Sequence, residues 1–384
     1  MIRPRKTKMN VCPVVCAVGS SYMICVPVSA KVLMSVFVDG EEYTNNKCGV
    51  KISSCWVQKF VIPQEKLDRA KAYTVTYEII YREAYCSKKE KPVSESFSFN
   101  PVEKKDDIRI YHLSDVHGKK ASAIKAGGYF GEALDLLILN GDISSSTQTV
   151  SESLLPLKIA FAITKGERPC IITRGNHDLR GKYAERIGEF YPLCNEKFYY
   201  TVKLGPVWFL VLDCGEDKND DHREYAGTIA FHKYRQEETA FIHDVIRRSA
   251  EEYENDGVKY RCVVSHIPFM HTDYNPEKGI HEFDIEIDTY TEWVRLLNER
   301  VRPDFGLFGH VHQVCVVTDS EKYNQKGFRA PVILGGEPGS ESVEGCALTL
   351  KNNKAEIVFS DDKKNILTSE TVHLSHFIPG GNCI

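Results

Sequence analysis

Five short motifs along the chain carry side chains of the kinds that bind metal ions or contact phosphate. In chain order they are Asp115-Val116-His117, Gly141-Asp142, Gly175-Asn176-His177-Asp178, Ser265-His266 and Gly309-His310-Val311-His312. Asp, Asn and His provide the oxygen and imidazole nitrogen atoms that hold hard to borderline divalent cations. A single motif of this kind more often forms a turn. The five together predict a metal centre suited to phosphate chemistry.

Each motif follows an apolar run with the composition of a strand, at residues 108–113, 136–139, 170–173, 262–264 and 305–308. Helical apolar spacing occurs at 151–164, 239–253 and 287–299, and strand-like runs return from 313 to about 373. This alternation predicts a layered α/β fold, in which sheets pack between helices. Ligands gather beyond the carboxyl ends of strands in such folds, so we expect the five motifs to converge there.

The first 100 residues have a different pattern, with β-branched and aromatic runs at 22–26, 32–38, 57–62 and 73–81. Asp39-Gly40, directly after one of these runs, is a hairpin signal. We therefore predict a small all-β domain of immunoglobulin or fibronectin type over residues 1–100 and a catalytic domain over 101–384. The charged segment around 100–107 is expected to link them.

The composition argues against some classes of partner. The chain has 42% hydrophobic and 27% charged residues and a formal net charge of −4. These values are ordinary for a soluble protein, and the basic excess typical of nucleic-acid or membrane-surface binding is missing. The sequence has no uninterrupted run of about 18 apolar residues, so we expect no membrane-spanning helix.

The 13 cysteines are scattered without the paired spacing of a zinc site, and several lie in apolar strand-like runs. This pattern favours free thiols in a reducing cytoplasm. The alternative is secretion, because the basic residues at 3–8 precede an apolar stretch at 11–30 that faintly resembles a signal peptide. Pro13, Gly19 and Pro27 interrupt this stretch, which is better explained as two strands joined by a turn.

The five motifs, in this order, resemble the signature of the calcineurin-like metallophosphoesterase superfamily over roughly residues 108–350. The resemblance implies a β-sandwich flanked by helices and a centre of two divalent or trivalent metal ions. The implied ligands are Asp115, His117 and His312 for the first metal, Asn176, His266 and His310 for the second, and Asp142 as the bridge. A bridging anion offsets the repulsion between two cations about 3.5–4 Å apart. Such ligands fit manganese, iron, zinc or cobalt and do not decide among them.

The same resemblance implies roles for His177 and Asp178. His177 would contact phosphate and protonate the leaving alkoxide, and Asp178 would hold its imidazole in one tautomer. A hydroxide bridging the two metals would attack phosphorus. The predicted function is metal-dependent hydrolysis of phosphomonoesters or phosphodiesters, with a phosphorylated small molecule as substrate. The alternative is a non-catalytic protein that uses the fold to recognise a partner.

A β-type domain before the catalytic domain resembles the layout of purple acid phosphatases. Those enzymes carry a ligand tyrosine where this chain has Ser145, and here the first motif supplies His117 instead, so their colour is not expected. Other positions stay open. Arg174 and Arg180 contact phosphate or lie on the surface, His271 lines a substrate pocket or has no role, and residues 271–288 form a lid or a solvated loop.

Overall fold

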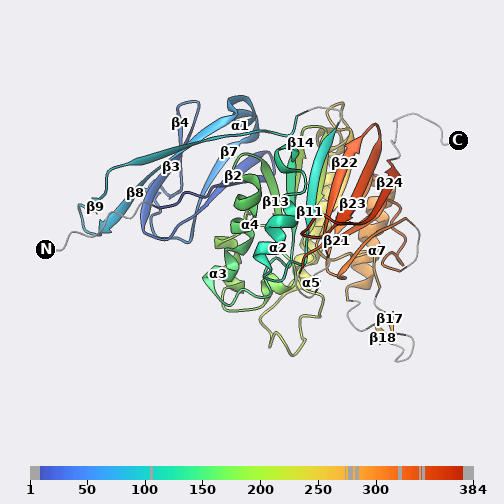
Figure 1. Ribbon diagram of the computed structural model, residues 1–384. Coiled ribbons are helices and arrows are strands. Elements are labelled where there is room, and N and C mark those ends of the chain that lie inside the picture. The colour runs from blue at the N-terminus through green and yellow to red at the C-terminus, as the bar shows by residue number, and fades with distance from the viewer. Residues whose placement is uncertain are drawn as a thin grey trace.

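The computed structural model describes residues 9–103, 107–272, 274–275, 280–281, 285–318, 322–336, 339 and 342–374. Within these residues most strands belong to three sheets. Figure 1 shows the two larger sheets with helices on their outer faces, and the N-terminal sheet to one side of them.

The largest sheet has the strand order β24-β23-β22-β11-β12-β13-β1-β2-β7 within the described residues. Its strands are β1 (Val14–Val18), β2 (Ser21–Pro27), β7 (Val57–Pro63), β11 (Ile108–Leu113), β12 (Leu136–Asn140), β13 (Pro169–Thr173), β22 (Gly345–Lys351), β23 (Lys354–Ser360) and β24 (Ile366–His373). At its centre β11, β12 and β13 are parallel.

The second large sheet has the order β14-β15-β16-β19-β21-β20 in the same part of the chain. Its strands are β14 (Tyr200–Leu204), β15 (Val207–Val211), β16 (Tyr260–Val264), β19 (Phe305–Phe308), β20 (Gln313–Val317) and β21 (Val332–Gly336). Strands β15, β16, β19 and β21 are parallel, and the two edge strands are antiparallel to them.

The N-terminal sheet has the order β10-β8-β3-β4, and β9 also pairs with β8. Its strands are β3 (Val32–Val38), β4 (Glu41–Thr44), β8 (Ala72–Arg82), β9 (Lys88–Lys89) and β10 (Val93–Ser98). The turn between β3 and β4 contains Asp39 and Gly40, as the hairpin signal predicts. Two small two-stranded sheets pair β5 (Asn46–Lys47) with β6 (Val50–Lys51) and β17 (Tyr274–Asn275) with β18 (Ile280–His281).

The helices lie mainly on the outer faces of the two large sheets, except the first, which packs against N-terminal strands (Figure 1). They are α1 (Gln64–Ala70), α2 (Lys120–Gly127), α3 (Val150–Ser153), α4 (Leu155–Thr164), α5 (Phe231–Arg247), α6 (Ser249–Glu252) and α7 (Ile287–Leu296). Short turns of 3₁₀ type are η1 (Gly131–Ala133), η2 (His177–Leu179) and η3 (Ala184–Glu189), and a π-type turn, η4 (Leu297–Val301), follows α7.

Strand β15 shows how the layers are built. All five of its residues are buried. Val207, Phe209 and Val211 belong to the core between the two sheets, whereas Trp208 and Leu210 belong to a second core that includes apolar residues of α5 and α7. Alternate residues of a strand point to opposite faces, so a strand covered on both faces is apolar throughout. The two sheets between helical layers, preceded by all-β structure, confirm the predicted fold class.

The N-terminal strands are shared between two sheets. Strands β1, β2 and β7 extend the largest sheet, because β1 pairs with β13 in parallel and places Cys16 beside Cys170. The apolar stretch at 11–30 therefore lies mainly in β1 and β2, which are joined by a turn at Gly19 and Ser20. The boundary near residue 100 stays a prediction, and this sheet continuity shows that part of the first 100 residues packs with the predicted catalytic domain.

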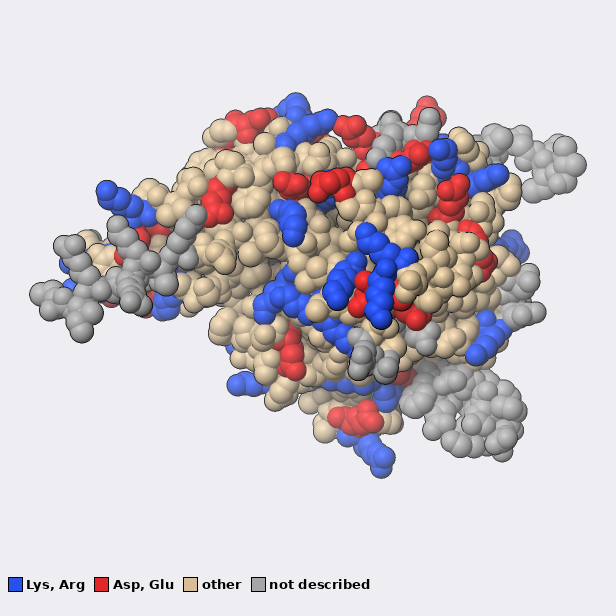
Figure 2. Space-filling view, in the orientation of Figure 1, with Lys and Arg blue, Asp and Glu red and all other residues tan. Residues whose placement is uncertain are grey.

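No helix among the described residues is long and apolar enough to cross a membrane. The cysteines at the described positions are free thiols. On the face shown in Figure 2, basic and acidic side chains are interspersed over much of the surface. The segment 271–288, expected to be a lid or a solvated loop, falls partly outside the described residues, since 273, 276–279 and 282–284 are not among them.

Candidate metal centre

The five motifs lie at the carboxyl ends of strands from both large sheets. Neighbouring parallel strands end at the same edge of a sheet, so the loops that follow them come together. Asp115 and His117 follow β11, Asp142 follows β12, Asn176 and His177 follow β13, His266 follows β16, and His310 and His312 follow β19. All seven predicted metal ligands therefore come from the same edge of the sandwich.

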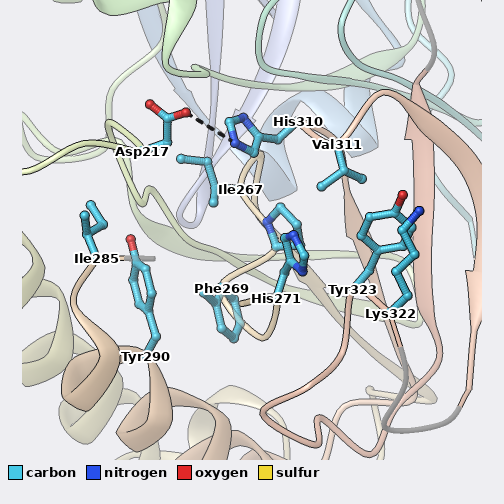
Figure 3. A pocket seen from close by; sticks show the side chains of 11 residues that line it. Asp217, Ile267, Phe269, His271, Ile285, Tyr290, His310, Val311, Lys322 and Tyr323 are labelled. Carbon is cyan, nitrogen blue, oxygen red and sulfur yellow. Dashed lines mark ion pairs between the residues drawn. The ribbon is translucent and has the colours of Figure 1, made fainter. Parts of the chain in front are cut away.

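One group of ligand-type atoms comprises Asp142, His266 and His310, all within 4.8 Å of one another. Nδ1 of His266 donates to the carbonyl oxygen of Asn140 at 2.8 Å, and its Nε2 lies 3.3 Å from the Asp142 carboxylate. A histidine whose other ring nitrogen donates to a carbonyl is fixed in the tautomer that a metal site requires. Nε2 of His310 lies 3.6 Å from the Asp217 carboxylate, which leaves Nδ1 for the centre (Figure 3).

Asn176 borders this group through its side-chain amide. Its Oδ1 lies 3.1 Å from Nδ1 of His310. With the amide turned the other way, its nitrogen would donate to His310 and Asp142, and its oxygen would accept from Arg180 at 2.9 Å. A metal ligand must present its oxygen to the cation. A role for Asn176 as a metal ligand would require the orientation with Oδ1 beside His310, whereas the turned orientation satisfies the hydrogen bonds of the amide in this structure.

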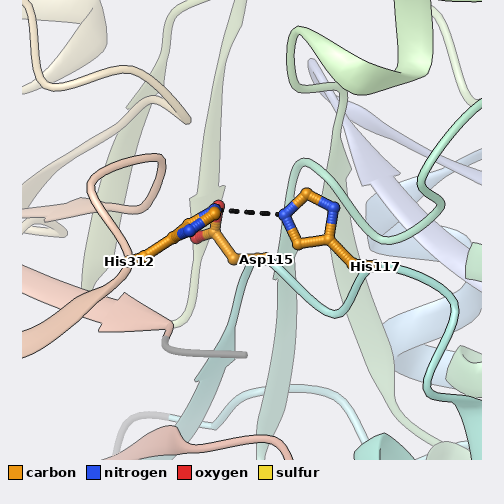
Figure 4. A group of neighbouring side chains, drawn as sticks. All are labelled: Asp115, His117 and His312. Atoms are coloured by element: carbon orange, nitrogen blue, oxygen red, sulfur yellow. Dashed lines mark hydrogen bonds and ion pairs between the residues drawn. The ribbon is translucent and has the colours of Figure 1, made fainter. Parts of the chain in front are cut away.

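A second group comprises Asp115, His117 and His312 (Figure 4). The Nε2 atoms of His117 and His312 face each other at 3.1 Å, and Nε2 of His312 lies 3.5 Å from Oδ1 of Asp115. Two imidazole lone pairs at this distance repel unless a proton or a cation lies between them. Asp142 is also grouped with His117 and His177, so its carboxylate lies close to both sets of ligands.

The electrostatics of these groups suit a cation. Burial raises the pKa of Asp115 to about 7, and the negative charge of Asp142 adds to the rise. Burial also opposes ionisation of Asp142, but nearby histidines, His266 foremost, hold its pKa below the usual value. Burial lowers the pKa of His117 to about 4, so its imidazole is neutral, which is the metal-binding form.

His266 differs because burial, which alone would lower its pKa, is outweighed by Asp142 and Asp115, and its pKa rises to about 10. The buried carboxylates of Asp142 and Asp115 are thus stable as anions only with a positive charge beside them. In the metal-free chain a proton on His266 supplies that charge, and a bound dication would replace the proton. The donor set therefore fits metal ions.

His177 is held by groups that the sequence did not indicate. Its Nδ1 lies 3.0 Å from the carbonyl oxygen of Ser145, and its Nε2 lies 3.0 Å from Nη1 of Arg180. A carbonyl only accepts and a guanidinium only donates, so Nδ1 carries the hydrogen and Nε2 presents its lone pair. The backbone N–H of His177 donates to Oδ1 of Asp142 at 2.8 Å.

Asp178 does not orient His177, contrary to the prediction. Its Oδ2 accepts from the backbone N–H groups of Gly175 at 2.8 Å and Asp142 at 3.1 Å. Its Oδ1 accepts from the hydroxyl of Tyr191 at 2.8 Å. Two backbone N–H groups and the hydroxyl of buried Tyr191 occupy the oxygens of the Asp178 carboxylate, so these oxygens are not available to the imidazole of His177. Asp178 therefore joins the loop after β13 to the loop after β12.

The loops that carry the ligands approach one another too closely for larger residues. A Cβ atom on Gly175 would lie 2.2 Å from Oδ1 of Asp142 and 2.7 Å from Cδ2 of His266. A Cβ atom on Gly141 would lie 2.5 Å from Cγ of His266. Glycine at these two positions is thus required by the packing of the ligands.

Other residues near the motifs fall into three cases. Arg174 is buried and its guanidinium pairs with Asp213 at 2.6 Å, so the surface alternative is wrong and its charge is already matched. Asn140, which sequence reasoning missed, donates through Nδ2 to the carbonyl oxygens of Ser265 and Leu307 at 3.0 and 3.2 Å. It thereby ties β12 to the ends of β16 and β19. His271 lines a cavity beside His310.

A model of the calcineurin-like phosphoesterase family matches residues 108–314, which is more than half of the chain. The chain belongs to this family. At that level it is related to metal-dependent phosphoester hydrolases, and the grouped Asp and His side chains could hold metal ions.

Two solved structures share the fold of nearly the whole chain. The first is purple acid phosphatase PPD1 from yellow lupin (Lupinus luteus) seeds, with a TM-score of 0.57 and 11% identity over 94% of this chain and 74% of that one. The second is PhoD, with a TM-score of 0.54 and 11% identity over 97% of this chain and 93% of that one. A comparison with curated proteins gave no match. At this level of identity the similarity concerns the fold alone, and it confirms the resemblance to the purple acid phosphatase layout.

Proposed function

We propose that the chain is a two-metal hydrolase of phosphate esters that acts on a phosphorylated small molecule. The observation that carries the proposal is the clustering of the seven predicted ligands, with the Asp142 carboxylate close to both groups. His117 and His177 on one side, and His266 and His310 on the other, group with this one buried carboxylate. Two bound metal ions would activate water and neutralise the charge that develops on the phosphoryl oxygens.

The predicted ligands would be divided between the two metals, and Asp217 would orient one of them. Asp115, His117 and His312 would hold one metal, Asn176, His266 and His310 the other, and Asp142 would contact both. Asp217, beside His310, would keep that imidazole in the tautomer that presents Nδ1 to the metal.

His177 and Arg180 would handle the phosphate and the proton. A guanidinium matches the geometry of phosphate oxygens, and the Arg180 side chain lies next to Asn176 and His177. When a phosphate oxygen accepts the hydrogen bond of Arg180, Nε2 of His177 becomes available to carry a proton to the leaving oxygen. Nδ1 of His177 keeps the imidazole in place through Ser145.

The test is hydrolysis of p-nitrophenyl phosphate and bis-p-nitrophenyl phosphate by Mn²⁺-loaded protein, with the metal content measured in parallel. We expect Asp142→Asn to lose metal and activity together. His177→Ala should keep its metal and lose about 10²–10⁴-fold in rate, the usual contribution of general acid–base catalysis. His243→Ala is the matched control, because His243 lies on α5 and pairs with Glu292 away from the centre.

Failure of the metal-loaded protein to hydrolyse either ester would contradict the proposal and favour the non-catalytic alternative. An equal rate for His177→Ala and the unchanged protein would contradict the role of His177 alone. The ratio of the two activities separates a monoesterase from a diesterase.

A further inference from the structure

A cavity of about 390 Å³ lies beside the candidate metal centre, on the side of His310 that faces Asp217 (Figure 3). Its volume falls within the range of about 300–1,000 Å³ that is typical of small-molecule sites. Most of the remaining lining is apolar or aromatic and includes Phe269, Tyr290 and Tyr323. An organic group can therefore bind next to the metal ions.

One wall of the cavity is rigid because it is backed by packed aromatic rings. Phe269 is buried, and its ring lies edge-on to Trp293 at 5.6 Å and to Phe308 at 5.7 Å between centroids. Tyr290 packs against the same Trp293 ring at 5.3 Å. Neither Phe269 nor Tyr290 can turn away without breaking these contacts, so this wall is preformed.

The opposite wall is formed by Tyr323, which Figure 3 shows across the cavity from Tyr290. The backbone of Tyr323 has a φ of 72°, in the left-handed region that a bulky residue rarely adopts. Its ring contacts the ring of His271 at 5.3 Å between centroids, and Nζ of Lys322 lies 4.7 Å from the ring centre. Strain of this kind persists where the surrounding structure fixes the residue, and it occurs most often at functional sites.

The position of the cavity decides which part of a substrate it receives. His310 belongs both to the metal centre and to the cavity lining, whereas His177 is not among the described residues that line it. His177 is the group proposed to protonate the leaving oxygen, so the leaving group departs on its side. A substituent that enters the cavity beyond His310 is therefore one that remains on phosphorus.

We propose that this cavity binds the non-leaving group of a phosphodiester, and that this group is a planar aromatic or heteroaromatic ring. The inference rests on the proposed function and narrows it from phosphate esters in general to diesters with a ring on the retained oxygen. Aromatic rings pair favourably at centroid separations of about 4.5–7 Å, and the rings of Tyr290, Phe269 and Tyr323 offer such partners.

The test compares phenyl p-nitrophenyl phosphate with methyl p-nitrophenyl phosphate, using the full chain loaded with Mn²⁺. Both diesters have the same charge and the same leaving group and differ only in the retained substituent. In each case the oxygen of water bonds to phosphorus and the bond to the p-nitrophenyl oxygen breaks. His177 would pass a proton to that oxygen, and the p-nitrophenol formed then releases the proton to solvent. The product is phenyl or methyl phosphate.

We expect kcat/KM to be at least about tenfold higher for the phenyl ester, because small apolar differences in a fitted pocket give about 10–200-fold discrimination. Tyr323→Asn should reduce that ratio at least about threefold, since Asn tolerates the left-handed backbone but removes the ring. Tyr43→Leu is the matched control and should leave both rates unchanged. Tyr43 is also a half-buried tyrosine with a lysine over its ring, but it lies on β4.

Binding of phenylphosphonate and methylphosphonate, measured by calorimetry on the same Mn²⁺-loaded protein, tests the cavity without turnover. Tighter binding of phenylphosphonate that weakens in Tyr323→Asn would support the proposal. Equal kcat/KM for the two diesters, or a ratio unchanged in Tyr323→Asn, would overturn it. Hydrolysis of p-nitrophenyl phosphate without hydrolysis of either diester would overturn it and leave the proposed function intact. No hydrolysis of any ester would instead refute the proposed function.

Discussion

Substitution of Asp178, the residue after His177, distinguishes two roles for its carboxylate, which are to orient His177 or to join the two loops. If Asp178 fixed the tautomer of His177, Asp178→Asn would remove that support, and the analogous change in a Ser-His-Asp triad costs on the order of 10⁴-fold in rate. The structure assigns the carboxylate to Gly175, Asp142 and Tyr191 instead. An Asn side chain can keep its oxygen on the two backbone N–H groups and donate to the Tyr191 hydroxyl, which can rotate to accept. We therefore expect Asp178→Asn to retain kcat within about tenfold.

Asp178→Ala should behave very differently because it leaves three buried donors without an acceptor. At about 1–1.5 kcal/mol for each lost hydrogen bond, the free energy of unfolding should fall by about 3–5 kcal/mol. The loop with Asn176 and His177 would also lose its attachment to the loop with Asp142. The Ala variant should therefore lose stability and metal content together.

The pH dependence of the free energy of unfolding is a second, independent test of the environment of Asp178. Burial, and then the charge of Asp142, raise the pKa of Asp178 from 3.8 to about 7 in the metal-free chain. Between these two pKa values the unfolded chain releases a proton that the folded chain keeps, so stability is lost as the pH rises from about 4 to about 7. At 1.36 kcal/mol per pH unit the contribution is on the order of 4 kcal/mol, and Asp178→Asn should remove it.

The assays are urea denaturation in EDTA at pH 5 and pH 8, and steady-state hydrolysis after Mn²⁺ loading. We expect the Asn variant to lose less stability than the unchanged protein between the two pH values. A loss of more than about 10³-fold in kcat for Asp178→Asn, with metal content unchanged, would show that Asp178 acts through His177 after all.

Three further outcomes follow from the contacts at the centre. Metal loading at pH 8 should release about one proton from His266, because Asp142 and Asp115 hold its pKa near 10. Calorimetry in two buffers of different ionisation enthalpy measures this proton release. Binding heats that do not depend on the buffer would contradict it. Gly175→Ala should abolish metal binding, since its Cβ would lie 2.2 Å from Asp142 Oδ1, and normal Mn²⁺ content in a folded variant would count against the geometry. Asn140→Ala should destabilise the metal-free protein by about 2–4 kcal/mol in a denaturant titration, because two buried carbonyl groups lose their donor.

The sequence predicted the types of ligand and their approximate convergence, but not the groups that orient them. The ligand types can be predicted from the sequence because few side chains bind metal ions. Their convergence can be predicted because each motif follows an apolar run. The partner of His177 is a backbone carbonyl, that of Ser145, and any residue type could provide it. Asp217 lies in a segment without periodicity or motif, and only the folded chain brings it to His310.

The same distinction explains the N-terminal strands. Local pattern correctly indicated short strands and a turn between β1 and β2. Whether such strands form a separate sandwich or extend a neighbouring sheet depends on which sheet has an edge strand that can pair with them. Here β13 offers its edge to β1, and the burial of Cys16 and Cys170 between the layers stabilises that pairing. Periodicity along one strand carries no information about its neighbour.

The backbone at the centre is the part of the structure that local propensity would least favour. Five of the seven predicted ligands have left-handed φ values, between 46° and 71°, namely Asp115, His117, Asp142, His310 and His312. Each such residue costs on the order of 1 kcal/mol or more and persists only where its surroundings fix it. Here the fixing contacts are hydrogen bonds between loops, from the N–H of Asp115 to Gly141 and from that of His117 to Asp142. Below them Asn140 ties the two sheets together, so the sandwich holds the ligand loops in conformations that they would not adopt alone. The stability of the two sheets thus maintains the geometry on which the proposed chemistry depends.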